Sequence, residues 1–277
     1  MLSIKRCKPL LGTYVSVQLR ADFGEDRLMG LSDRAFSKMA TLEKRMSFHD
    51  PQSELSYLNR EAANRCCEIS DDMAAVLGSA MLLSRLTAGR YDLSIAPELV
   101  KNGLLPQIHT VIAGRGSWQD ICLEKNKLHF KRPLLLDLGG IAKGYAVDQA
   151  FLSIQDEVDD VVINAGGDLR MKCWQGKTVA IKTHHQAANS TVDVLMKSAA
   201  VATTAAYYFG PGHSAIIDPE TREMLLSEQS VSVYAQSCVI ADALTKVVLL
   251  ADNVKQILQS MCASAVIVGD DGAIRSL

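Results

Sequence analysis

The sequence predicts an α+β fold in which strands and helices do not alternate strictly. Alternating apolar and polar residues at positions 14–19 predict a strand, and apolar residues at helical spacing from Leu28 to Met46 predict a helix after it. The second half of the chain holds several short β-branched runs, at residues 178–181, 192–195 and 231–234. This mixture favours mixed or antiparallel sheets flanked by helices over a doubly wound parallel sheet.

The remaining elements follow from their end signals. Ser70 precedes two carboxylates, Asp71 and Asp72, so it is a suitable N-cap for a helix that continues to Leu83. The other predicted elements are helices over 141–151 and 238–250, a buried strand over 161–164, and a hairpin whose strands are 121–123 and 128–130.

The composition is that of a globular protein, with 277 residues, 48% of them hydrophobic and 22% charged. A net charge of −2 gives no general attraction to nucleic acid or anionic lipid. No apolar run near the N-terminus is long enough for a signal peptide or a membrane helix. As written, the sequence predicts a cytoplasmic protein without a membrane segment, or a periplasmic one whose leader or lipoprotein signal was removed.

The cysteines argue against two kinds of stabilisation. Their number is odd, seven, and no CxxC pair occurs. A disulfide framework and a zinc ribbon are therefore disfavoured, and we expect reduced, mostly buried thiols.

The most informative segment is LLLDLGGIAKGYAVD at residues 134–148. An apolar strand ends at Asp137, a Gly139-Gly140 turn follows, and a helix opens near Ile141. Glycines let a backbone approach a ligand closely, and free N–H groups at a helix start favour a phosphate, to which Lys143 would add positive charge. The local pattern alone leaves a phosphate site and a plain strand–turn–helix equally open.

Three further segments carry polar residues with two interpretations each. Asn164, Gly166, Gly167 and Asp168 follow a buried strand and form either a ligand-approach turn or a tight hairpin, which the local pattern favours. On the late helix, Asp242 and Lys246 share one face and form either a surface ion pair, again favoured locally, or part of a magnesium site. In the segment 89–99, Asp92 either binds a ligand or caps a turn.

The order of these motifs is more specific than any one of them. Along the chain stand Gly12-Thr13, SELSYLN (53–59), GRYDLSIAPEL (89–99), DLGGIAKGYAVD (137–148), NAGGDLR (164–170), VATT (201–204), IIDP (216–219) and VSVYAQSCVIADAL (231–244). Together they resemble the ApbE family, the FAD:protein FMN transferases, over nearly the whole chain.

This resemblance implies one domain over residues 1–277, with two lobes around a central FAD cleft. The implied enzyme moves FMN from FAD to a Thr or Ser hydroxyl of a target protein and releases AMP, with Mg²⁺ bridging the diphosphate. Such a phosphoryl transfer needs charge neutralisation and alignment more than covalent help. A non-transferring FAD-binding paralogue, or an FAD pyrophosphatase that yields FMN and AMP, are the alternatives.

The resemblance also assigns residues. The metal would be held by the Gly140 carbonyl and Asp242, with Thr245 as the nearest hydroxyl. The predicted catalytic residues are Asp242, Lys246 and His213. The predicted cofactor contacts are Leu11, His49, Arg90, Tyr91, Asp92, Asp137, Lys143 and Ile217.

The chain departs from the family pattern on the metal and acceptor side. Lys246 stands where the family has a metal-binding threonine, and Thr245 precedes it by one residue, or about 100° of helix rotation. We expect Lys246 to pair with Asp242, and either to neutralise the diphosphate in place of the metal or to abolish metal binding. Ala215 replaces a histidine, for which His213 would substitute only if the backbone bulged, and residues 203–205 read TTA in place of the usual TSG turn.

Overall fold

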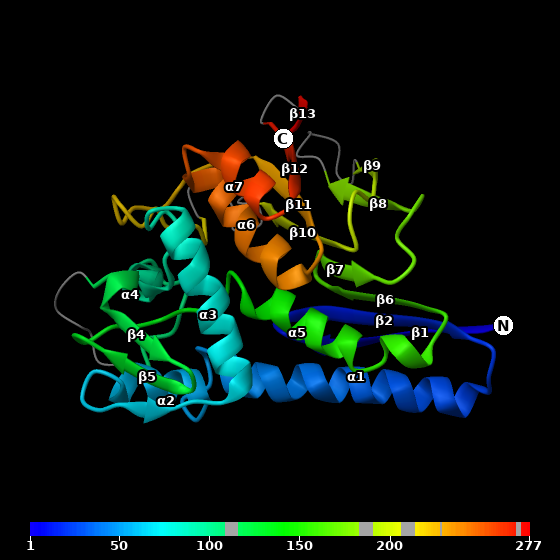
Figure 1. Cartoon of the computed structure of the whole chain (residues 1–277), viewed down its shortest axis with the longest axis horizontal. Helices are drawn as coiled ribbons and strands as arrows, with labels where there is room; N and C mark the ends of the chain where they lie inside the picture. The colour runs from blue at the N-terminus through cyan, green and yellow to red at the C-terminus, as the bar shows by residue number, and fades with distance from the viewer. Residues whose placement is uncertain (109–115, 183–190, 206–213, 228, 270–272) are drawn as a thin grey trace.

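The computed structural model describes residues 1–108, 116–182, 191–205, 214–227, 229–269 and 273–277. These residues form two lobes, a large antiparallel sheet covered by helices and a smaller lobe built on a three-stranded sheet (Figure 1). Neighbouring strands in every described sheet run antiparallel. The predicted α+β class is confirmed.

The large sheet has eight described strands. In spatial order they are β1 (Leu2–Leu10), β2 (Thr13–Ala21), β6 (Asp160–Ala165), β7 (Asp168–Met171), β10 (Ala200–Ala205), β11 (Ser230–Ala235), β12 (Ser264–Val268) and β13 (Ile274–Ser276). Strand β1 is absent from the sequence prediction because its lysines and arginine hide the alternation. It pairs with β2 along its whole length, from Leu2 opposite Ala21 to Leu10 opposite Thr13.

Helices cover one face of this sheet. They are α1 (Glu25–Met46), α5 (Ala142–Leu152), α6 (Cys238–Leu250) and α7 (Val254–Ser260). The strand period of two sends buried side chains of β10 to opposite faces, so that Ala200 joins the core under the helices while Val201 joins a second core. The strands β8 (Thr178–Lys182) and β9 (Thr191–Leu195) contribute apolar side chains to that second core.

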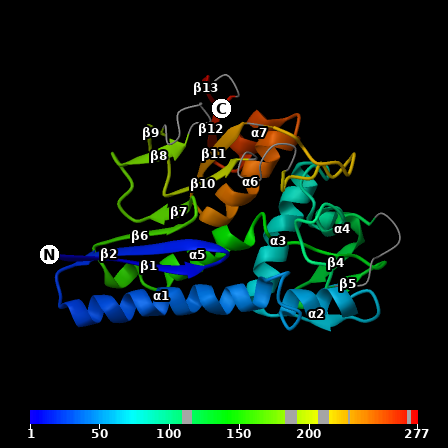
Figure 2. The ribbon, with the colours of Figure 1, turned by 180° about the vertical axis from the view of Figure 1, so that it is seen from behind.

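The smaller lobe lies at the C-terminal end of α1, as both views show (Figures 1 and 2). It contains β3 (Cys67–Glu68), β4 (Ile121–Glu124), β5 (Lys127–Phe130), α2 (Glu54–Glu61), α3 (Asp71–Leu86) and α4 (Ala96–Lys101). Along the chain, short 3₁₀ turns follow α3 at Leu93–Ile95, precede β4 at Trp118–Asp120 and follow α5 at Gln155–Glu157. The predicted cap of α3 is confirmed, because the Ser70 hydroxyl accepts a hydrogen bond from the Met73 N–H at 3.2 Å.

The thiols are free, but the expectation that most are buried is wrong. Four of the seven are exposed, namely Cys7, Cys66, Cys173 and Cys262. Cys7 lies in strand β1 and the other three lie outside the helices and strands. Among the described helices none is long and apolar enough to cross a membrane.

Candidate functional site

The site begins where α5 and α6 approach each other most closely. A Cβ atom at Gly144 would lie 2.4 Å from the Cys238 carbonyl oxygen and 2.9 Å from the Asp242 Cβ, so only glycine permits this contact. The Asp148 carboxylate accepts hydrogen bonds from the N–H groups of Cys238 and Val239, both at 2.9 Å. A residue of α5 thus caps α6 and fixes its first turn against α5.

Asp242 lies one turn into α6 and is 1% exposed. Its Oδ2 accepts a hydrogen bond from the Gly144 N–H at 3.2 Å, and its Oδ1 accepts one from the Lys246 ammonium at 2.6 Å. Burial raises the pKa of Asp242, but the positive charges of Lys246 and Lys143 outweigh burial and leave the pKa below its ordinary value. The carboxylate is therefore ionised at neutral pH.

The ammonium of Lys246 lies over the first glycine turn. A Cβ atom at Gly140 would be 3.2 Å from the Lys246 Cε and 3.8 Å from its Nζ. The same ammonium donates a second hydrogen bond to the Asp242 backbone carbonyl at 3.2 Å. The expected i,i+4 ion pair forms, but the prediction of a surface pair is wrong, because the side chains of Lys246 and Asp242 are only 20% and 1% exposed.

A second ion pair joins the two glycine motifs. Lys143 of α5 bonds to Asp168 at the start of β7, directly after the Gly166-Gly167 turn. Burial, followed by the charge of Asp242, raises the pKa of Asp168 to about 6, although Lys143 and Lys246 pull it down. The charges of the two lysines and the two aspartates therefore interact within one compact cluster.

The start of α5 offers fewer free N–H groups than the sequence suggested. The N–H groups of Ile141 and Ala142 both donate to the Leu138 carbonyl, and the Gly144 N–H donates to Asp242. The expectation of free donors is wrong for these three positions. The positive charge at the turn comes instead from Lys143 and Lys246.

Tyr91 and Asp137 border the same turn. The Tyr91 hydroxyl lies 3.5 Å from the Gly140 carbonyl oxygen, and burial followed by the charges of Asp242 and Asp137 raises the pKa of Tyr91 well above its ordinary value. Tyr91 thus remains a protonated donor. Asp137 accepts a hydrogen bond from the Gly139 N–H at 3.0 Å, and burial raises its pKa.

Among the described residues, the Asp92 carboxylate accepts hydrogen bonds from two backbone N–H groups. One carboxylate oxygen accepts from the Ser94 N–H at 2.8 Å and the other from the Trp118 N–H at 3.0 Å. Of the two interpretations of Asp92, the geometry favours the turn cap. Its contact with a cofactor stays a prediction.

Arg90 connects the two lobes. Its two terminal nitrogens donate to both carboxylate oxygens of Asp218, at 3.0 and 3.1 Å, and its Nε donates to the Leu250 carbonyl at 2.6 Å. This planar fork fixes the IIDP segment against the C-terminal end of α6. Neither Asp218 nor its role was predicted, since a single Asp-Pro pair gives no signal of a distant arginine.

The other predicted residues lie in different surroundings. Leu11 is half-buried in the turn between β1 and β2 with φ of 56°, and His49 is exposed. Ile217 is 1% exposed. His213 lies outside the described residues. Thr245 bonds through its hydroxyl to Thr204 at 2.9 Å and to the Asp242 carbonyl at 2.7 Å.

A family model described as the ApbE family matches residues 11–267. The chain belongs to the ApbE family. It is 27% identical over 267 residues to the FAD:protein FMN transferase of Chlamydia pneumoniae, covering 88% of this chain and 81% of that protein. It is 26% identical over 262 residues to that of Vibrio cholerae, covering 85% of this chain and 78% of the relative.

Solved ApbE structures have the same fold. The flavin transferase ApbE from Vibrio cholerae superposes with a TM-score of 0.84 at 21% identity, covering 100% of this chain and 96% of that one. The ApbE protein from Thermotoga maritima gives 0.83 at 22% identity, covering 99% and 96%. The predicted ApbE-like fold is confirmed.

The residues at the expected metal position of this ApbE protein do not fit Mg²⁺. An ion about 2.1 Å from an Asp242 oxygen would have to share that carboxylate with the ammonium of Lys246. A divalent ion and an ammonium 4 Å apart repel by about 8 kcal/mol at an effective dielectric constant of about 20. In the part of the chain that the structure describes, no group of three or more His, Cys, Asp or Glu residues could hold a metal ion.

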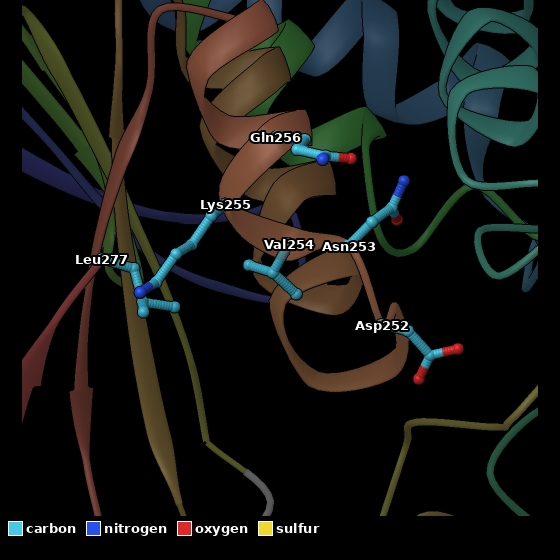
Figure 3. A pocket seen from close by; sticks show the side chains of 6 residues that line it. All are labelled: Asp252, Asn253, Val254, Lys255, Gln256 and Leu277. Atoms are coloured by element: carbon cyan, nitrogen blue, oxygen red, sulfur yellow. The ribbon is translucent and has the colours of Figure 1, made fainter.

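A separate cavity of about 540 Å³ opens at the start of α7. It is lined by Asp252, Asn253, Val254, Lys255, Gln256 and Leu277. Figure 3 shows Lys255 extending toward Leu277, while Asp252 and Asn253 point away from it. None of the predicted site residues lines this cavity, so it takes no part in the proposals below.

Proposed function

We propose that this chain is an FAD:protein FMN transferase, which moves FMN from FAD to a Thr or Ser hydroxyl of a target protein and releases AMP. The observation that carries the proposal is the cluster of Lys143, Lys246, Asp168 and Asp242 beside the Gly139-Gly140 turn. The named activity of the relatives in Chlamydia pneumoniae and Vibrio cholerae supports the same assignment.

The chemistry suits these side chains. A diphosphate brings negative charge close to the protein, and the breaking of its P–O bond leaves more charge on the departing phosphate of AMP. Two ammonium groups held in a partly buried cluster stabilise that charge without having to reorganise. The bare backbone at Gly139 and Gly140 allows the diphosphate to approach them.

The substrate-side contacts are part of the same proposal. Tyr91, with its hydroxyl at Gly140, and Asp137, two residues before Gly139, lie where FAD would pass the turn. Five further residues remain predicted FAD contacts, namely Leu11, His49, Arg90, Asp92 and Ile217. The effect of a divalent ion on the reaction is to be measured.

The experiment incubates the chain with FAD and an acceptor protein that bears the family's acceptor motif. The expected result is an acceptor whose intact mass has increased by one FMN, with an equal amount of AMP released. A standard ApbE protein run in parallel verifies the acceptor. An unmodified acceptor in that setting contradicts the proposal.

The two alternatives give different readouts in the same reaction. A binding-only paralogue would be isolated yellow, with tightly held FAD and no AMP. An FAD pyrophosphatase would release FMN and AMP at the same rate with or without the acceptor.

A further inference from the structure

We propose that the Lys246 ammonium replaces a divalent cation in this site, so that the chain binds the diphosphate of FAD and transfers FMN without a metal. The binding half of the inference needs only an affinity for FAD. The transfer half rests on the proposed function.

The ammonium of Lys246 has hydrogen-bonding capacity left for a ligand. An ammonium has three N–H donors. Two are directed to Asp242, to the carboxylate at 2.6 Å and to the backbone carbonyl at 3.2 Å. Among the described residues no partner takes the third, and the ammonium lies beside the unsubstituted Gly140 backbone. This leaves one charged donor for a phosphate oxygen at the turn.

The groups next to Lys246 have hydrogen-bond partners that leave no ligand free for a metal. Asp242 is fully buried, with one oxygen on Lys246 and the other on the Gly144 N–H. The Thr245 hydroxyl is directed to Thr204 and to its own helix, and the residue is 0% exposed. An ion at Asp242 would have to displace Lys246, and the Thr245 hydroxyl is already held by its two partners.

The ammonium of Lys246 is fixed in place. Its side chain is 20% exposed, and it lies between the Asp242 carboxylate and the turn at Gly140. A cation held in this way acts on a diphosphate as a pre-positioned point charge, which is the electrostatic part of a metal's role. Lys143, held by Asp168, adds a second such charge.

The transfer step balances without a metal. The acceptor hydroxyl oxygen attacks the phosphorus of the FMN half, and the bond from that phosphorus to the bridging oxygen breaks. AMP leaves with the bridging oxygen and the electron pair, and the hydroxyl proton passes to solvent. Lys246 donates its third N–H to the diphosphate throughout.

The test is a titration of the chain with FAD, followed by flavin fluorescence, in EDTA and again in millimolar Mg²⁺. We expect the same Kd within about twofold under both conditions, whereas Lys246→Met weakens binding about tenfold or more, as loss of a charged hydrogen bond predicts. Lys246→Thr should bind FAD appreciably only with Mg²⁺. Lys44→Ala, at an exposed position on α1, is the matched control and should bind as the wild type does.

Three results would overturn the binding half: wild-type binding that is lost in EDTA and restored by Mg²⁺, unchanged affinity in Lys246→Met, or no FAD binding at all. Circular dichroism establishes whether Lys246→Met is folded. If it is not, Lys246→Arg, which keeps the charge, must retain metal-independent binding, and loss of that binding counts against the inference.

The two proposals fail separately. Metal-independent, Lys246-dependent FAD binding without transfer to a verified acceptor refutes the proposed function and leaves the binding half standing. Transfer that proceeds only with Mg²⁺ supports the proposed function and overturns the inference about metal-free transfer.

Discussion

Lys143 of α5 and Asp168 of β7 form an ion pair that joins the two glycine turns of the chain. The strand predicted to end at Asp137 is wrong, since the described chain has no strand between β5 and α5, and Gly139-Gly140 instead joins an irregular segment to α5. The Gly166-Gly167 turn joins β6 and β7 as an ordinary hairpin. The ion pair brings both glycine turns to the buried Asp168 carboxylate. Asp242 and Lys246 of α6 lie beside it, so the two turns form one site.

Lys143→Met tests whether the Lys143–Asp168 ion pair contributes to stability and to FAD binding. It removes a positive charge from the FAD site and leaves the buried Asp168 without its cation. We expect a free energy of unfolding lower by about 1–3 kcal/mol and an FAD Kd raised about tenfold. Urea unfolding and fluorescence titration measure the two effects. Wild-type values for both would show that the pair has no role in stability or binding.

The close contact between α5 and α6 depends on Gly144. In Gly144→Ala the new methyl group would lie 2.4 Å from the Cys238 carbonyl oxygen, so the helices must separate. We expect a loss of about 1–3 kcal/mol in the free energy of unfolding. Gly78→Ala is the matched control, since a Cβ there meets nothing within 4 Å and sits within α3, where alanine favours the helix by about 1 kcal/mol.

Arg90 and Asp218 make a two-pronged contact between the lobes. Asp218→Asn keeps the size of the side chain but removes its charge and one acceptor oxygen, so one hydrogen bond from Arg90 is weakened and the other is lost. We expect faster amide hydrogen exchange in residues 216–225 and little change in the exchange of β1 and β2. An unchanged exchange pattern would mean that the fork does not hold this segment.

The pH dependence of stability should report Asp168. Its pKa is raised from 3.8 to about 6, so its contribution to stability is fully present below about pH 4 and is lost as the pH rises through about 6. Asp168→Asn removes this dependence. We therefore expect the free energy of unfolding of the wild type, measured relative to that of Asp168→Asn, to fall between about pH 4 and pH 6. A constant difference would contradict the assignment.

Local sequence signals predicted many of the elements but few of the contacts between them. The late helix is predicted at residues 238–250 and observed as α6 (Cys238–Leu250), because the apolar period of its sequence is a local signal. Strand β1 was not predicted, since its identity comes from pairing with β2. The turn after β6 is the hairpin that the local pattern favoured, with Gly166 and Gly167 at positive φ.

The site shows the same division between local and tertiary information. The residues Gly140, Lys143, Asp168, Asp242 and Lys246 were all singled out in the sequence, and the structure brings them together. Their surroundings were not predictable, because burial and capping arise only on folding. The Asp148 cap on α6, the Arg90–Asp218 fork and the buried state of the Asp242–Lys246 pair depend on residues distant in sequence.

The most direct measurement is a crystal structure of this chain with FAD, grown in the presence of Mg²⁺. We expect the diphosphate at the Gly139-Gly140 turn, with the Nζ atoms of Lys143 and Lys246 each within about 3.2 Å of a phosphate oxygen. We expect no ion between the Gly140 carbonyl and Asp242. A diphosphate bound elsewhere would contradict the proposed site, and an ion at that position with Lys246 displaced would contradict the role given to the lysine.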